Sequence, residues 1–213
     1  MTNLEFALIA LAMVFFIVDP LGNIPIFLAV TEGASPDERN RTAKRASIAT
    51  LLILLFFAFT GEWILKLFQV TMESFQIAGG ILIFVIALSM LQAKRSRAKS
   101  SPEEEDERLT QEDVSIFPLA IPMLSGPAAI TTVMVLMNLS HSVTQRAIVI
   151  LAIGVTSGST YFILRESGRL LQVLRQTGIN VLTRLMGLLL AVIAVQFIID
   201  GIKMVLTAMA AAE

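Results

Sequence analysis

Two short proline-containing segments interrupt apolar stretches of the sequence and carry the residues best suited to bind a ligand. They are Pro20-Leu-Gly-Asn-Ile-Pro25 and Pro122-Met-Leu-Ser-Gly-Pro127, and each has a glycine and a small polar residue between its prolines. A proline inside a helix removes a backbone hydrogen bond and costs about 3 kcal/mol. An apolar environment offers no water to the freed groups, so such breaks are tolerated where they line a polar cavity. The exposed helix ends can then bind an ion or a polar solute.

The residue order in both segments predicts a helix that starts in the middle of an apolar run. Asp19-Pro20 has the pattern of an N-cap followed by proline at the first helical position, and Ser125-Gly126-Pro127 is similar. The positive end of a helix dipole suits a carboxylate. Asp19 is also the acid nearest the centre of an apolar run, where an unpaired charge costs at least about 3 kcal/mol. It could couple transport to protons, pair with a substrate ammonium, or cap a helix.

The candidate substrate-binding residues belong to these two segments and to the turn that follows the second. Their polar side chains could hydrogen-bond a ligand, and they could equally satisfy the interrupted backbone. The prolines could also simply kink two packed helices. Because the pattern occurs twice, we favour a binding site. The residues are Asp19, Pro20, Gly22, Asn23, Pro25, Pro122, Ser125, Gly126, Pro127, Thr131 and Thr132, with Asp19 as the candidate ion-coupling group.

The elements that position these segments are expected to be membrane-spanning helices. Of the 213 residues, 55% are apolar and 15% charged, and the mean hydropathy is +0.78, which is typical of membrane proteins. A helix needs about 20 apolar residues to cross a hydrocarbon core of about 30 Å. Six runs of that kind predict an all-α, polytopic membrane protein. They are Leu4–Val30, Ala46–Leu65, Phe75–Leu91, Val114–Leu139, Ala147–Leu164 and Leu182–Ile199.

The six runs divide into two similar halves. Besides the two proline segments, Gly80 and Val85-Ile86-Ala87 in the third run match Gly187 and Val192-Ile193-Ala194 in the sixth. Three spans per half is an odd number, so the halves are predicted to be inverted repeats with interrupted helices 1 and 4. The predicted divisions are residues 1–93, a charged cytoplasmic linker at 94–113, and residues 114–213.

The distribution of basic residues predicts an orientation. Thirteen of the 16 Lys and Arg residues lie in or beside the loops between spans 1 and 2, 3 and 4, and 5 and 6. The opposite side has Lys66, Arg146 and Lys203. The positive-inside rule therefore predicts that those three loops are cytoplasmic and that both termini lie outside.

Several other classes of function lack their signature residues. There are no cysteines for disulfides, thiol chemistry or metal binding, and His141 is the sole histidine. The net charge of −1 does not favour nucleic acid as a partner. No phosphate-binding loop, dinucleotide-binding turn, HExxH motif or nucleophile elbow is present. We therefore expect no enzymatic activity, no cofactor and no metal, and we expect Glu62 and Asp200, which lie near span ends, to be peripheral.

Two glycine pairs predict close helix packing. They are Gly79-Gly80 in the third run and Gly154-x3-Gly158 in the fifth, and small residues of this kind let membrane helices approach one another closely.

The sequence resembles the MarC family over nearly its whole length apart from the 94–113 linker. The resemblance is carried by Asp19-Pro-Leu-Gly-Asn-Ile-Pro-Ile-Phe27, Ile121-Pro-Met-Leu-Ser-Gly-Pro-Ala-Ala-Ile130, Asn180-Val-Leu-Thr-Arg-Leu-Met-Gly187 and Gln196-Phe-Ile-Ile-Asp-Gly201. It implies a six-span protein of the bacterial inner membrane within the LysE-like transporter superfamily. Some relatives in that group are regarded as carriers of small neutral amino acids.

The leading hypothesis is secondary transport or export of small neutral amino acids such as glycine and alanine, by alternating access between interrupted helices 1 and 4. The small residues at the breaks favour a compact ligand over a large drug. The alternatives are efflux of hydrophobic compounds and a non-transporting membrane partner that docks through the 94–113 linker. The expected partners are a small-molecule substrate and the lipid bilayer. A homo-oligomer is also compatible with the sequence.

Overall fold

The computed structural model describes residues 2–92 and 124–210, and every secondary-structure element in these ranges is a helix. The linker predicted at 94–113 and Pro122 of the second proline segment lie outside the described residues. The elements are α1 (Asn3–Val18), α2 (Ile24–Val30), α3 (Pro36–Leu67), α4 (Met72–Leu91), α6 (Pro127–Asn138), α7 (Val143–Arg165) and α8 (Ser167–Ala210).

Within the described residues, four helical segments are long and apolar enough to cross a membrane. They are Pro36–Leu67, Met72–Leu91, Val143–Arg165 and Thr177–Thr207, and they contain the predicted spans 2, 3, 5 and 6. The helices α1 and α6, from predicted spans 1 and 4, are apolar but shorter. Large apolar side chains such as Phe59 of α3, Phe162 of α7 and Val192 of α8 are exposed on the outer surface. A surface of this kind suits contact with lipid.

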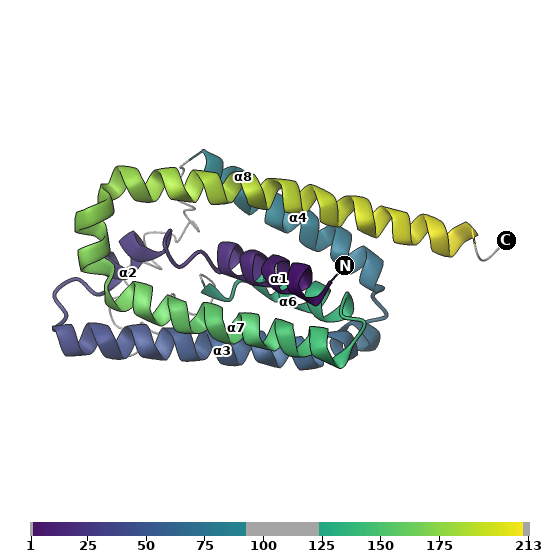
Figure 1. Cartoon of the computed structure of the whole chain (residues 1–213), viewed down its shortest axis with the longest axis horizontal. Helices are drawn as coiled ribbons and strands as arrows, with labels where there is room; N and C mark the ends of the chain where they lie inside the picture. Colours follow the sequence, from purple (N-terminus) through teal and green to yellow (C-terminus); the bar gives the residue numbers. More distant parts are fainter. Residues whose placement is uncertain (1, 93–123, 211–213) are drawn as a thin grey trace.

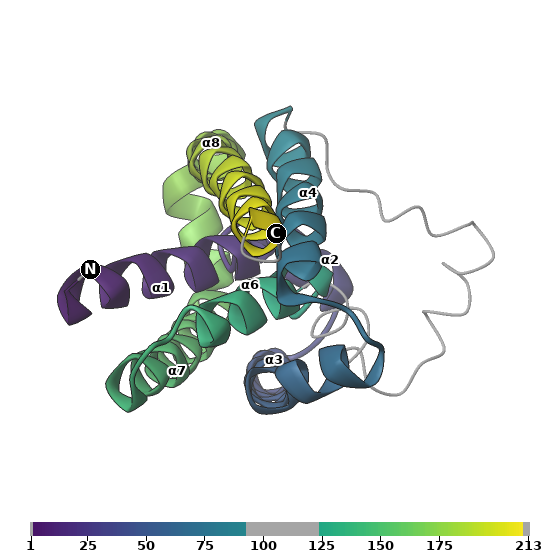
Figure 2. The ribbon, with the colours of Figure 1, turned by 90° about the vertical axis from the view of Figure 1, so that its right-hand side faces the viewer.

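The helices form two antiparallel pairs with α1 and α6 between them (Figure 1). The view along the long axis shows α4 and α8 on one side, and α3 and α7 on the other (Figure 2). The start of α3, the junction of α7 with α8, and the end of α4 lie at one end of the bundle (Figure 1). Both termini and the connections from α3 to α4 and from α6 to α7 lie toward the opposite end (Figure 1).

Glycines bring α4 and α8 into backbone contact. A Cβ atom at Gly80 of α4 would lie 2.9 Å from the carbonyl oxygen of Ala194 in α8. A Cβ atom at Gly187 of α8 would lie 3.1 Å from the carbonyl oxygen of Ala87 in α4. Neither position has room for a side chain. The close approach predicted for the third run is therefore confirmed, and Gly187 makes the equivalent contact from the other helix.

The second predicted glycine contact is wrong for the described chain. No described atom lies within 4 Å of a Cβ placed at Gly154 or Gly158, because this face of α7 points away from its helix neighbours. The exposed Leu151 and Val155 lie in the same stretch of the helix. The sequence pattern shows that a helix could approach closely here, but not that one does.

Two helices extend beyond the predicted apolar runs. Helix α3 begins at Pro36, well before Ala46, because Ser35 and Glu38 form a capping box at its start. Its first turns are charged, so hydropathy alone misses them. Helix α8 begins at Ser167 and bends at Arg175, whose backbone angles of φ 51° and ψ 169° are not helical. The apolar part of α8 follows this bend.

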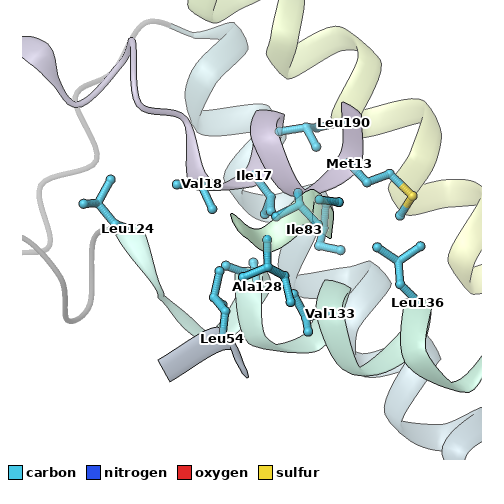
Figure 3. Close-up of a cluster of buried hydrophobic side chains, with 14 of the residues drawn as sticks. Met13, Ile17, Val18, Leu54, Ile83, Leu124, Ala128, Val133, Leu136 and Leu190 are labelled. Atoms are coloured by element: carbon cyan, nitrogen blue, oxygen red, sulfur yellow. The ribbon is translucent and has the colours of Figure 1, made fainter. Parts of the chain in front are cut away.

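The buried core is continuous across the bundle. It includes side chains from α1, α3, α4, α6, α7 and α8. Figure 3 shows how Ile17 and Val18 at the end of α1, Leu54 of α3 and Ala128 of α6 converge near its centre. Helix α1 therefore ends, and α6 begins, within the core.

Candidate functional site

Helix α1 ends at Val18, in the middle of the first apolar run, and Asp19 is its C-cap. Asp19 has φ 46° and ψ 60°, in the left-handed region, which Asp tolerates better than most residues. Its backbone N–H donates to the carbonyl of Phe15. The prediction that Asp19 is the N-cap of a helix starting at Pro20 is therefore wrong. The Asp-Pro pair has a common N-terminal pattern, but here the preceding helix runs up to the aspartate and closes on it.

The break after α1 satisfies its own backbone groups. The Asp19 carboxylate accepts a hydrogen bond from the backbone N–H of Gly22 at 2.9 Å. The buried side-chain amide of Asn23 donates to the carbonyls of Val18 at 3.2 Å and Asp19 at 2.9 Å. A Cβ at position 22 would collide with the Asp19 carboxylate, so a larger residue there would displace this side chain. Asp19, Gly22 and Asn23 thus act together to end α1 inside the core.

The helix that follows this break is too short to be a strong anion site. Helix α2 has seven residues, Asn23 is its N-cap without a side-chain capping bond, and Pro25 lies in its first turn. Its few aligned peptide groups give only a small dipole. Of the two helix N-termini predicted at the breaks, only the second belongs to a helix of several turns.

That second N-terminus is the start of α6. Gly126 is the N-cap and Pro127 the first helical residue, as predicted from the sequence. The first intrahelical hydrogen bond is donated by Ile130 to the carbonyl of Gly126. The N–H groups of Ala128 and Ala129 therefore have no acceptor within the helix, and Gly126 has no side chain to cap them. Both alanines are buried, whereas Pro127 is exposed.

Polar side chains accompany this helix start. Ser125, Thr131 and Thr132 are all buried. The hydroxyl of Thr132 has no hydrogen-bond partner among the described residues. The side chain of Thr131 packs against Gly79 of α4, so it contributes to the contact between these helices.

Sequence reasoning missed a second group of polar side chains, which lies on α3 and α7. Ser47, Thr156 and Ser157 are buried, and their hydroxyls make no hydrogen bond within the described chain. The nearby Thr50 and Thr160 instead donate to the carbonyl four residues earlier in their own helix, at 2.9 and 2.8 Å. A buried hydroxyl without a partner costs about 1–3 kcal/mol. The available signal was the polar stretch Thr156-Ser-Gly-Ser-Thr160 inside an apolar run.

The two helices hold these hydroxyls at the same level of the bundle. The Tyr161 hydroxyl of α7 donates to the Asn40 side chain of α3 at 2.9 Å, which sets the register of this antiparallel pair. At about 1.5 Å per residue, Ser47 lies about 10 Å beyond Asn40, and Ser157 about 6 Å before Tyr161. Both displacements run in the same direction. Ser47 and Ser157 therefore lie within about one helical turn of each other along the bundle.

The other charged residues singled out from the sequence lie in exposed positions. Glu62 forms an ion pair with Lys66 at 2.7 Å, and Asp200 accepts a hydrogen bond from Gln196 at 2.8 Å. No group of three or more potential metal-ligating side chains occurs in the part of the chain that the structure describes.

Comparison with known proteins identifies the family. The sequence model of the family described as "MarC family integral membrane protein" matches residues 4–206 of this chain. The chain belongs to the MarC family. Among its relatives, a UPF0056 membrane protein of Methanocaldococcus jannaschii is 39% identical over 94% of this chain and 98% of its own length.

Other members of the MarC family are similar over comparable lengths. A UPF0056 membrane protein of Pyrococcus abyssi is 44% identical over 89% of this chain and 90% of its own length. The UPF0056 inner membrane protein YhgN of Escherichia coli is 37% identical over 92% of this chain and 95% of its own length. No solved structure matches the chain. The family and the apolar helices together establish a multi-pass integral membrane protein.

Proposed function

We propose that this MarC-family chain is a secondary transporter or exporter of small neutral amino acids such as glycine and alanine. The observation that carries the proposal is the position of two helix ends inside one buried cluster. Helix α1 ends at Val18 and α6 begins at Pro127, and both ends contribute to the same core. Interrupted helices at this depth are a feature of transporter substrate sites.

The chemistry of the two breaks fits opposite ends of an amino acid. The N–H groups of Ala128 and Ala129 suit the substrate carboxylate, because they lie at the positive end of α6. Oxygen Oδ1 of Asp19 accepts the hydrogen bond from Gly22, and Oδ2 is the second oxygen of the same carboxylate. That oxygen is the proposed acceptor for a substrate ammonium or for a coupling proton. We propose that the buried hydroxyls of Ser47, Thr156 and Ser157, which have no partner within the described chain, also contribute to this site.

The contacts between helices support the proposed inverted repeat of six spans. Gly80 contacts Ala194 and Ile198, and Gly187 contacts Ala87 and Leu91. The same residue offset separates Gly80 from Gly187, Ala87 from Ala194, and Leu91 from Ile198, so exchanging the two halves reproduces the contact. The other packing pairs fit the same exchange of halves. The contact of α1 with α7 is equivalent to the contact of α6 with α3, and the contact of α3 with α7 is its own equivalent.

The distribution of charge supports an orientation in the bacterial inner membrane with both termini periplasmic. The basic start of α3 and the basic junction of α7 with α8 lie at one end of the bundle (Figure 1). Both termini lie toward the other end (Figure 1). The positive-inside rule then assigns the basic end, with loops 1–2, 3–4 and 5–6, to the cytoplasm.

The test is counterflow of labelled glycine and alanine in proteoliposomes, with and without a pH gradient. We expect saturable uptake by the wild type and its loss in Gly126→Leu, which places a bulky side chain at the start of α6. Gly154→Leu is the matched control, because the same change falls on an open face of α7. We expect Asp19→Asn to lose the component of uptake driven by the pH gradient.

Other outcomes would contradict the proposal. Equal loss in Gly126→Leu and Gly154→Leu would argue against a site at α6. Absence of wild-type uptake in folded protein would reject small neutral amino acids as substrates. Uptake of hydrophobic compounds that glycine does not compete with would instead favour the efflux alternative.

A further inference from the structure

A further polar region, separate from those described above, lies away from the helix breaks, at the end of the bundle where α6 meets α7. A cavity of about 180 Å³ opens there between α3, α6, α7 and the start of α4. Pockets for drug-sized ligands measure about 300–1,000 Å³, so this cavity suits a smaller molecule.

The cavity is lined by two side chains of opposite charge. Glu62 of α3 and Arg146 of α7 both line it, as does Asn138 at the end of α6. Glu62 forms its ion pair with Lys66 through Oε1, at 2.7 Å. That pair is largely exposed, so it adds little stability and can rearrange around a ligand.

The remainder of the lining is apolar and adaptable. Ala58, Met134 and Met137 contribute to the wall, together with aromatic side chains of α3. Methionine side chains are flexible and can fit against small apolar groups of varied shape. A carboxylate, a guanidinium and an apolar wall around one small cavity match the ammonium, the carboxylate and the short side chain of a small neutral amino acid.

We infer that this cavity is an outer binding site for a small zwitterion, in which Arg146 binds the carboxylate and Glu62 the ammonium of a glycine- or alanine-like amino acid. The inference rests on the proposed transport function, which it extends by a second site. Helix α6 connects the two sites, with Gly126 at one end and Asn138 at the other. Its 12 residues separate them by about 18 Å. In the proposed orientation the cavity lies on the periplasmic side, where substrate leaves or enters.

The chain contains its own reporter for this cavity. Trp63 is the sole tryptophan, is exposed, and directly follows Glu62. The experiment is a titration of purified full-length protein with alanine, followed by Trp63 fluorescence and requiring no transport. We expect a saturable change in the wild type and at least a tenfold weaker apparent affinity in Glu62→Gln and Arg146→Gln. Lys203→Gln, which removes one exposed charge outside the cavity, is expected to titrate like the wild type.

A second arm distinguishes a free amino acid from a zwitterionic lipid headgroup. If short-chain phosphatidylethanolamine changes the fluorescence through Glu62 and Arg146 and alanine does not, the amino-acid assignment is overturned. Unchanged alanine titrations in both charge variants would overturn the site itself. The Gly126→Leu variant is expected to lose transport but retain the titration.

The titration and the transport assay fail independently. Transport without a titration that depends on Glu62 and Arg146 would reject the outer site alone. A titration that depends on them without any transport would reject the proposed function alone, and the cavity would remain a binding site for the zwitterion.

Discussion

The contact between α4 and α8 allows a quantitative test with single methyl groups. In Gly80→Ala, the new Cβ would lie 2.9 Å from the carbonyl oxygen of Ala194 and 3.2 Å from the backbone nitrogen of Ile198. Ordinary contacts to carbon lie at about 3.5–4.0 Å. Both neighbouring atoms belong to a helical backbone, which cannot give way one atom at a time. The two helices must therefore separate by several tenths of an ångström.

The expected effect follows from two opposing contributions to the free energy of unfolding. Overpacking costs about 1–3 kcal/mol, whereas alanine stabilises a helix interior by about 0.5–1 kcal/mol relative to glycine. Gly154→Ala receives the second contribution but not the first, because nothing described lies within 4 Å of it. We expect Gly80→Ala to be less stable than Gly154→Ala by about 1–3 kcal/mol.

The symmetric position provides a further check. Gly187→Ala is expected to have a similar effect, because its Cβ would lie 3.1 Å from the Ala87 carbonyl oxygen. The double variant is expected to lose less stability than the sum of the single variants, since one separation of α4 from α8 relieves both contacts. Equilibrium unfolding in bicelles, followed by circular dichroism, measures these differences. Equal stability of Gly80→Ala and Gly154→Ala would refute the backbone contact.

Two further predictions concern the buried polar groups. Thr156→Val removes a hydroxyl that has no partner within the described chain. It is expected to raise the KM for transport about 2–10-fold, the equivalent of one hydrogen bond of about 0.5–1.5 kcal/mol. The control is Thr160→Val, which is expected to leave KM unchanged because the Thr160 hydroxyl is already bonded within its own helix. Similar KM values for the two variants would remove Thr156 from the site. Asn23→Ala is expected to lower the free energy of unfolding by about 1–3 kcal/mol, because the carbonyls of Val18 and Asp19 lose a buried donor. A wild-type free energy of unfolding for this variant would contradict the role of Asn23 in satisfying the backbone carbonyls at the break after α1.

The sequence alone determined the class of the protein and the location of its irregular backbone. Hydropathy depends on local composition, so the predicted runs 2, 3, 5 and 6 fall within the four described helical segments that are long and apolar enough to cross a membrane, in spite of shifted helix boundaries. Proline and glycine act on their own and adjacent turns, so the interruption of the first run and the start of α6 at Gly126-Pro127 could also be predicted. The family followed from whole-chain similarity, which motifs reveal directly.

Only the tertiary structure decided which helix end each polar residue serves and which small residues meet a partner. Asp19 could cap the helix before it or the helix after it, and its left-handed backbone angles together with the hydrogen bond from its N–H to the carbonyl of Phe15 determine the first outcome. Gly80 and Gly154 lie in similar apolar surroundings along the chain, yet one contacts backbone and the other faces open space. Likewise, Glu62 and Arg146 are far apart in sequence and line one cavity. Each of these outcomes depends on how helices distant along the chain rotate and pack against one another, which local composition does not encode.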